Sequence, residues 1–259
     1  MSWSLKEART KFAGTETCRR PILAVEEEAL LSVDAIDVHY GRSQALFGVG
    51  FEVGRREVVA IVGRNGAGKT TTLRSIMGIN PVSNGAVSFN GRRIEKLRPH
   101  QIARSGISYV PETRDPFSLL TVEENIMLGY RPGSPYDLRR IVGWFPDLAA
   151  LLRRRGAELS GGQQQMMVIG RGLALGPQLL LLDEPSQGLA PVIVKKVGEM
   201  LTALRGEDLS IVLVEQNIAF ALSLADRVVV MENGAVVDRL TADESRQDPE
   251  RIERYLGIH

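Results

Sequence analysis

The segment "GRNGAGKT", residues 63–70, has the residue types of a loop that binds phosphate. It fits the spacing G-x-x-x-x-G-K-[ST], follows the apolar run Val58–Val62 and precedes Thr71–Met77, which we expect to be helical. Glycines let backbone N–H groups close around phosphate, a lysine reaches the β- and γ-phosphates, and a hydroxyl binds Mg²⁺. With strand and helix signals on both sides, a glycine-rich turn without function is the weaker interpretation. The predicted ATP-binding residues here are Gly63, Arg64, Asn65, Gly66, Ala67, Gly68, Lys69, Thr70 and Thr71.

A pair of carboxylates follows an apolar run in "LLLLDEP", residues 179–185. Ligands of open α/β sheets bind at the carboxyl ends of the strands, so Asp183 and Thr70 are predicted to bind Mg²⁺. Glu184 is predicted to face the γ-phosphate and to accept a proton from the attacking water. Two acids that merely end a strand are common, but together with the phosphate loop they predict an ATPase.

A second predicted anion site lies almost a hundred residues after the phosphate loop, in "LSGGQQQ", residues 159–165. Ser160 is predicted to cap a helix, Gly161 and Gly162 leave its first turn bare, and apolar residues then recur at helical spacing. Unpaired N–H groups and the helix dipole favour an anion at such an end. We therefore add Ser160, Gly161 and Gly162 to the nucleotide-binding residues.

Two kinds of strand must position these segments. "VVAIV", "LLLL" and "IVLV" are continuous apolar runs, as in parallel strands buried on both faces. "LLSVDAIDVHYG" and "AVSF" indicate an antiparallel region in the N-terminal half. Asn84-Gly85, Asn90-Gly91 and Asn233-Gly234 are predicted hairpin turns. The expected fold class is α/β, with a parallel core sheet, an antiparallel addition and helices between the strands.

Composition limits the other possibilities. The chain of 259 residues has a formal net charge of +1, which gives no global electrostatic case for nucleic acid. Its single cysteine, Cys18, excludes an intrachain disulfide, and no apolar run approaches the roughly 20 residues that span a bilayer. We expect a soluble chain that reaches a membrane only through a partner.

Regular periodicity begins at about Leu30. Residues 1–29 are predicted to be a poorly ordered extension, unless translation begins further in, for example at Val25. Residues 30–259 are predicted to form one ATPase domain.

Taken in order, the three motifs resemble those of the ATP-binding subunits of ABC transporters, over residues 30–259. The resemblance implies a P-loop NTPase of ABC type: a RecA-like core, an N-terminal antiparallel β-region and an α-helical subdomain at about 112–158. It further implies that two subunits pair head to tail, so that "LSGGQQQ" contacts the γ-phosphate bound by the opposite subunit.

The resemblance also assigns residues outside these motifs. Tyr40 matches the aromatic residue that stacks on adenine, although an ordinary strand tyrosine is the alternative. Ser186–Leu189 match the loop that joins the two active sites. Glu112 replaces the usual glutamine that senses Mg²⁺, and Gln216 replaces the usual histidine at the γ-phosphate. The implied catalytic residues are Lys69, Glu184 and Gln216, and Glu112 joins the implied metal ligands.

"VPE", "LTVEEN", "LLLLDEPSQGLAP", "LVEQN" and "YLG" narrow the resemblance to branched-chain amino-acid importers. This implies a peripheral subunit at the cytoplasmic face of the membrane. Its partners would be permease subunits, a second ATPase subunit in a homo- or heterodimer and, indirectly, a periplasmic or extracellular substrate-binding protein. There are three alternatives: an importer of urea or short amides, a soluble ABC ATPase acting on ribosomes or DNA, and a regulatory module without turnover. Phe117–Leu120 are either a permease contact or part of the helical core.

Overall fold

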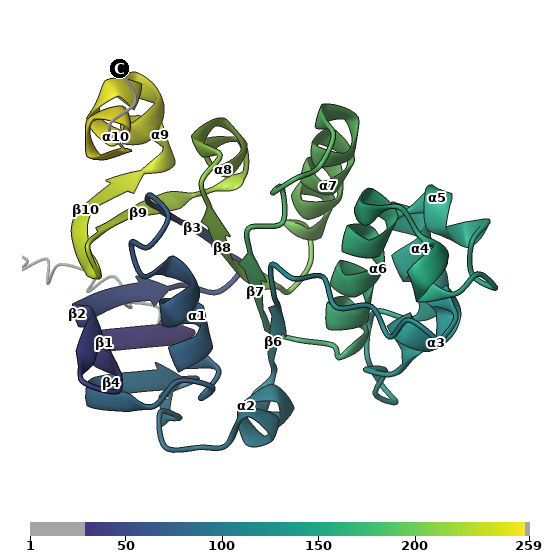
Figure 1. The fold of residues 1–259 in the computed structure, drawn as a ribbon, viewed down its shortest axis with the longest axis horizontal. Helices are drawn as coiled ribbons and strands as arrows, with labels where there is room; N and C mark the ends of the chain where they lie inside the picture. The colour runs from purple at the N-terminus through teal and green to yellow at the C-terminus, as the bar shows by residue number, and fades with distance from the viewer. Residues whose placement is uncertain (1–28, 257–259) are drawn as a thin grey trace, which may run out of the picture.

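The computed structural model describes residues 29–256, and the predicted extension lies outside them except for its last residue. A six-stranded sheet forms the centre, in the order β10-β9-β3-β8-β7-β6 (Figure 1). β6, β7, β8, β3 and β9 run parallel, and β10 pairs antiparallel with β9. The strands are β3 (Val58–Val62), β6 (Ile107–Val110), β7 (Leu179–Asp183), β8 (Ser210–Glu215), β9 (Arg227–Glu232) and β10 (Ala235–Thr241). The three apolar runs therefore form parallel strands, as predicted.

A second sheet is antiparallel, in the order β2-β1-β4-β5. Its strands are β1 (Leu31–Tyr40), β2 (Ser43–Val53), β4 (Val82–Phe89) and β5 (Arg92–Arg93). Both residues of Asn90-Gly91 and of Asn233-Gly234 have positive φ, and each pair joins two antiparallel strands as predicted.

The predicted hairpin turn at Asn84-Gly85 is wrong. Both residues lie inside β4, where the pairing with β1 changes register between Asp34 and Asp37. Gly85 has φ +88°, and a Cβ there would lie 2.4 Å from the carbonyl oxygen of Ala35. The glycine thus allows β4 to pass close to an irregular part of β1 and does not reverse the chain.

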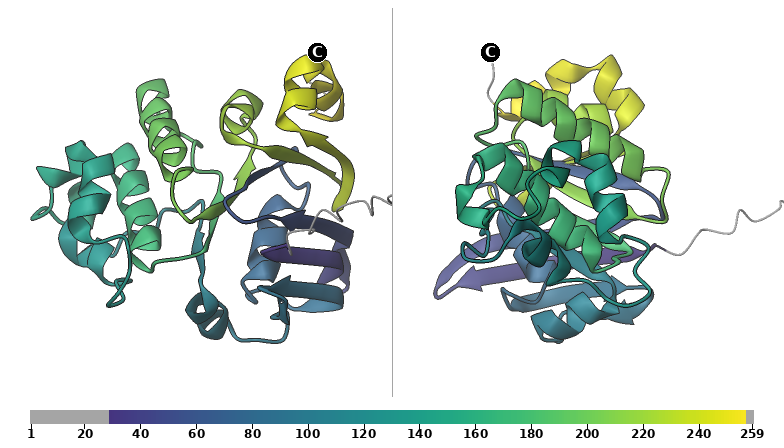
Figure 2. Two further views of the ribbon diagram at one scale, coloured as in Figure 1. Left: turned by 180° about the vertical axis from the view of Figure 1, so that it is seen from behind. Right: turned by 90° about the vertical axis from the view of Figure 1, so that its right-hand side faces the viewer.

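Helices cover both faces of the central sheet (Figures 1 and 2). Alternate strand residues separate the two faces: Leu179 and Leu181 pack with α1 (Lys69–Ile76) and the antiparallel sheet, whereas Leu180 and Leu182 pack with α6 and α7. The remaining helices of the core are α2 (Pro99–Ser105), α6 (Gly161–Ala174), α7 (Pro191–Leu204), α8 (Ile218–Leu224), α9 (Ala242–Gln247) and α10 (Pro249–Leu256). α1 and α6 therefore lie on opposite faces.

Between β6 and α6 the chain forms short helices that pack on α6. They are α3 (Val122–Met127), α4 (Leu138–Trp144), α5 (Pro146–Ala149) and the 3₁₀ helix Gly156–Glu158. Buried Ile126, Ile141 and Leu148 join them to Met166 and Ile169 of α6 in one apolar cluster. These helices fall within the span expected for a helical subdomain, and its boundaries remain a prediction.

Candidate functional site

The loop between β3 and α1 has a backbone that only glycine adopts readily. Gly66 and Gly68 have φ of +81° and +101°, in the region that side chains disfavour. A Cβ on Gly68 would lie 2.7 Å from Leu46 Cδ2, so space as well as backbone angle requires glycine there. α1 begins directly after Gly68, and its first N–H groups therefore open towards the loop.

Lys69, the first residue of α1, lies almost entirely buried in this loop. Its Nζ donates to the carbonyl oxygens of Gly63 at 2.9 Å and Arg64 at 3.2 Å. It also forms an ion pair with Glu184, Nζ to Oε1 3.2 Å. Gln216 Nε2 donates to the other oxygen of the same carboxylate, Oε2. The three predicted catalytic residues are thus in contact.

Asp183 is buried at the end of β7 and accepts two hydrogen bonds. Thr70 Oγ1 donates to its Oδ1 and Tyr109 Oη donates to its Oδ2, both at 2.9 Å. Burial raises the pKa of the Asp183 carboxyl, and the hydrogen bonds from Tyr109 and Thr70 oppose that rise. A hydroxyl and a carboxylate side by side are a donor set that suits Mg²⁺, which binds one or two protein groups together with phosphate oxygens. Within residues 29–256 there is no cluster of three His, Cys, Asp or Glu residues that would bind a metal unaided.

A cavity of about 480 Å³ opens beside Lys69. It brings together eight predicted site residues: Asn65, Gly66, Gly68, Lys69, Thr70, Thr71, Glu112 and Glu184. The rest of its wall is formed by Gln44, Ala45, Phe47 and the Asn233-Gly234 turn. Glu112 comes just after β6 and is exposed, so its carboxylate is accessible from the cavity. The amides of the loop and the ammonium of Lys69 can hold a phosphate chain in this cavity, and the carboxylates of Glu112 and Glu184 line the same space.

Tyr40 lies at the mouth of the phosphate loop with half of its surface exposed. Its hydroxyl accepts a hydrogen bond from Asn80 Nδ2 at 2.7 Å and lies 3.4 Å from Thr71 Oγ1. These contacts fix the ring close to α1 and leave part of it open to a ligand. Adenine stacking on Tyr40 remains a prediction.

Ser160 caps α6 as predicted: its Oγ accepts from the backbone N–H of Gln163, whose side chain accepts from the N–H of Ser160. Gly162 lies against α7, since a Cβ there would be 2.9 Å from Ile193 Cγ2. Ser160, Gly161 and Gly162 belong to the opposite face of the sheet from α1, and the residues that line the Lys69 cavity are others. The structure does not bring this group together with the phosphate loop of its own chain.

Beyond the cavity wall, three further residues that were not predicted from the sequence contact predicted site residues or the loop after Glu184. Tyr109 hydrogen-bonds Asp183, and Glu215, at the end of β8, accepts from the N–H and hydroxyl of Ser186 at 2.9 and 2.8 Å. Arg114 contacts both α6 and the loop after Glu184. The acids of "LVEQN" and "LLLLDEPSQ" end neighbouring parallel strands, and that adjacency was the available signal for Glu215.

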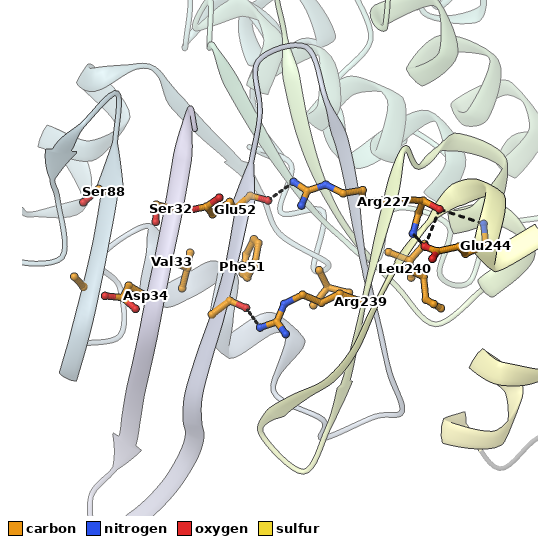
Figure 3. A pocket seen from close by; sticks show the side chains of 15 residues that line it. Ser32, Val33, Asp34, Phe51, Glu52, Ser88, Arg227, Arg239, Leu240 and Glu244 are labelled. Carbon is orange, nitrogen blue, oxygen red and sulfur yellow. Dashed lines mark hydrogen bonds between the residues drawn. The ribbon is translucent and has the colours of Figure 1, made fainter. Parts of the chain in front are cut away.

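A second cavity, of about 740 Å³, lies between the two sheets and is lined by none of the predicted site residues (Figure 3). Arg227 and Arg239 reach across it and donate to the carbonyl oxygens of Glu52 and Gly50 on β2. Its walls are strand backbone and side chains that join the two sheets. We therefore interpret this cavity as part of the contact between the sheets. The predicted site residues line the cavity beside Lys69 instead.

A model of the ABC transporter family matches residues 46–187, which include the phosphate loop, the Asp183–Glu184 pair and the start of α6. The chain belongs to the ABC transporter family. As a member it binds nucleotide and is an ATPase. In the part of the chain that is described, no helix is both long and apolar enough to cross a membrane.

The chain is similar in sequence to named transport proteins and in structure to a solved ATP-binding cassette. The chain is 41% identical to the high-affinity branched-chain amino acid transport ATP-binding protein BraG of Pseudomonas aeruginosa, over 88% of this chain and 100% of that protein. It is 34% identical to the probable branched-chain amino acid transport ATP-binding protein LivF of Archaeoglobus fulgidus, over 88% and 99%. A crystal structure of a nucleotide-free ATP-binding cassette from an ABC transporter superposes with a TM-score of 0.76 at 26% identity, over 89% of this chain and 100% of that one.

Proposed function

We propose that this chain is the ATP-hydrolysing subunit of an ABC importer that energises uptake of branched-chain amino acids through a separate permease. The observation that carries the proposal is the 41% identity over the full length of BraG, whose name gives that substrate class. The lipopolysaccharide export protein LptB of Acidithiobacillus ferridurans is 30% identical, so export of a lipid ranks lower. Urea and short-amide importers remain the alternatives within the importers.

The residues in and around the cavity would have separate roles in ATP binding and hydrolysis. Lys69 would exchange the carboxylate of Glu184 for the phosphate chain, which is a stronger partner for an ammonium in a ring of N–H donors. Thr70 and Asp183, with Glu112 at the cavity edge, would hold Mg²⁺, which supplies neutralisation of phosphate charge when bound. Released from Lys69, Glu184 would accept the proton of the attacking water, and Gln216 would keep its carboxylate in place.

We propose that a second ATPase subunit, identical or homologous, completes the site. Ser160 and the glycines after it lie on the other face of the central sheet from Lys69, so they would hold the γ-phosphate bound by the opposite chain. This accounts for two phosphate-binding segments in a chain with one Lys69 cavity.

The permease would dock beside the loop after Glu112, at the cytoplasmic face of the membrane. Phe117 is 53% exposed, Leu119 81% and Leu128 55%, an unusual group of large apolar side chains facing solvent. An amphipathic segment of a permease would cover them. A substrate-binding protein outside the membrane would then act on this chain only through the permease.

Uptake by cells that lack this gene tests the proposal. Radiolabelled leucine, isoleucine and valine should enter slowly, while urea and acetamide enter at the parental rate. The wild-type gene should restore uptake, and Glu184→Gln should not, because general-base catalysis contributes about 100-fold or more. Normal uptake of the three amino acids with loss of urea or acetamide uptake would overturn the substrate class. Full rescue by Glu184→Gln would overturn the role of Glu184.

A further inference from the structure

Arg114 joins three segments that are far apart in the sequence. It lies in the loop after Glu112, its Nε donates to Gln165 Oε1 on α6 at 3.1 Å, and its Nη2 donates to the carbonyl oxygen of Gln187. Its Nη1 lies so close to the first residue of α6 that a Cβ on Gly161 would be 2.7 Å from it. One guanidinium therefore bridges the Glu112 loop, the start of α6 and the loop that follows Glu184.

The backbone of the Glu112 loop is strained at the same place. Arg114 and the next residue, Asp115, have φ of +59° and +26°, which side-chain-bearing residues rarely adopt. Contacts from elsewhere keep them there: Arg171 of α6 donates to the carbonyl oxygen of Asp115 at 3.1 Å and stacks on the ring of Phe117 at 4.9 Å. The loop conformation thus depends on α6.

Gln165 of α6 depends in turn on Arg114 of the Glu112 loop. Its side chain is 1% exposed, and its Nε2 has no hydrogen-bond partner within the described part of the chain. Its Oε1 is held by Arg114. A buried donor without an acceptor is unfavourable, so the side chain would gain a bond in any rearrangement that offers Nε2 an acceptor. Loss of Arg114 would also leave the buried Oε1 of Gln165 without this donor, so α6 depends on the loop in turn.

We propose that Arg114 is a positioning residue that couples the Glu112 loop to the start of α6 and to the loop carrying Gln187. The inference rests on the proposed function, in which the Glu112 loop lies beside the permease and the other two segments face the opposite subunit. The planar fork of arginine suits this task because it donates in fixed directions to more than one acceptor. A displacement of the loop at Phe117 therefore moves the two segments that complete the opposite ATP site.

Hydrogen exchange in the isolated full chain tests the bridge directly. Arg114→Ala should raise exchange about tenfold in residues 160–165 and 186–190, since both lose a contact that restrains them. Arg114→Lys should do nearly the same, because a single ammonium keeps the charge but does not replace the fork. Exchange in α1, across the sheet, should stay unchanged and so reports an intact fold. A change confined to residues 112–118, or full protection in the lysine variant, would overturn the bridge.

ATP-dependent dimerisation tests whether Arg114 positions the segments that would complete the ATP site of the opposite subunit. In a Glu184→Gln background, Arg114→Ala should weaken ATP-dependent dimerisation about tenfold while the monomer binds ATP normally. Arg153→Ala is the matched control: it removes a 90% exposed arginine whose ion pair, with Glu123, stays within the helical region. Equal dimerisation of Arg114→Ala and Arg153→Ala would overturn the coupling. If Glu184→Gln itself never dimerises, the dimer of the proposed function fails, and the exchange result still decides the role of Arg114.

Discussion

Lys69 and Glu184 meet in the phosphate loop with both side chains almost removed from water, 3% and 6% exposed. A buried ion pair adds little over apolar packing, but removing one partner leaves an uncompensated charge and costs about 3–5 kcal/mol. The pair therefore makes nucleotide binding and folding stability depend on the same two residues, and variants have to be designed to separate the two effects.

Lys69→Ala should weaken ATP binding about 10- to 100-fold, the loss of a charge-assisted hydrogen bond worth roughly 1.5–3 kcal/mol. It should also lower the Tm, because Glu184 stays buried without its cation. The double variant Lys69→Ala/Glu184→Gln is the control: it should regain most of the Tm and none of the affinity. Fluorescent-nucleotide titration and thermal unfolding measure the two quantities. Unchanged affinity in folded Lys69→Ala would refute the assignment of the phosphate loop.

Glu112 lines the same cavity and is exposed. If it helps to hold Mg²⁺, Glu112→Gln should keep ATPase activity and shift the Mg²⁺ dependence to higher concentration, since an oxygen ligand remains but the charge is lost. Glu112→Ala should shift it further. ATPase rates across a Mg²⁺ titration decide this, and identical curves for both variants and the wild type would show that Glu112 does not contact the metal.

The ends of β7 and β8 place two carboxylates where water does not reach. Asp183 and Glu215 are each 1% exposed, and burial raises the pKa of both. Glu215 keeps three donors, the N–H and hydroxyl of Ser186 and the N–H of Asn217, which oppose this rise. Keeping these carboxylates charged at the strand ends is therefore unfavourable. In return, the Glu215 carboxylate holds Ser186 and so positions the loop after Glu184.

Glu215→Gln should therefore change how stability depends on pH. A carboxyl with a raised pKa in the folded state contributes stability that is present below its unfolded pKa, about 4.5, and is lost as pH rises through the folded value. The free energy of unfolding of Glu215→Gln minus that of the wild type should therefore increase as pH rises above about 4.5, by at most about 1.4 kcal/mol per pH unit. Urea unfolding at several pH values measures it. A constant difference across that range would contradict a raised pKa.

The elements that the sequence predicts well are those defined by local pattern. "VVAIV", "LLLL" and "IVLV" are buried on both faces because every residue is apolar, and the cap at Ser160 follows from its neighbours within three positions. The hairpin predicted at Asn84-Gly85 is absent because the positive φ of Gly85 serves close packing against β1 and not a chain reversal. Arg114, Tyr109 and Glu215 escaped prediction because their partners are 29 to 74 residues away.

At the scale of the whole molecule, the two helices whose starts are predicted to bind phosphate are separated by the central sheet. α1 and α6 cover opposite faces of the central sheet (Figure 1). In the described part of a single chain, the residues that line the Lys69 cavity therefore do not include Ser160, Gly161 or Gly162 at the start of α6. In the proposed dimer each Lys69 cavity would meet the start of α6 of the other chain, since an isologous arrangement brings unlike patches of two identical chains together twice.

Glu184→Gln should consequently dimerise with ATP, alone or with a partner ATPase, and much less with ADP, which lacks the γ-phosphate. Adding Ser160→Arg should abolish the dimer by steric hindrance and leave nucleotide binding at Lys69 intact. Ser160→Ala serves as a control that removes the cap, at about 1 kcal/mol, without adding bulk. Light scattering with each nucleotide measures the outcome. Monomers in every condition, partner included, would mean that α6 binds something other than a second subunit's ATP.

The distance between Lys69 and Ser160 within one chain also has a genetic consequence. An allele with Lys69→Ala and an allele with Ser160→Arg are each expected to be inactive, because each damages both sites of its own homodimer. In a mixed pair the two lesions fall in the same composite site, so the steric hindrance of Ser160→Arg occurs once instead of twice, and the other site, wholly wild type, can hold the pair together with ATP. For a homodimer, the two alleles should thus complement one another in one cell, and mixing the purified proteins should restore ATPase activity. Lys69→Ala and Glu184→Gln, whose lesions share one cavity, should not complement.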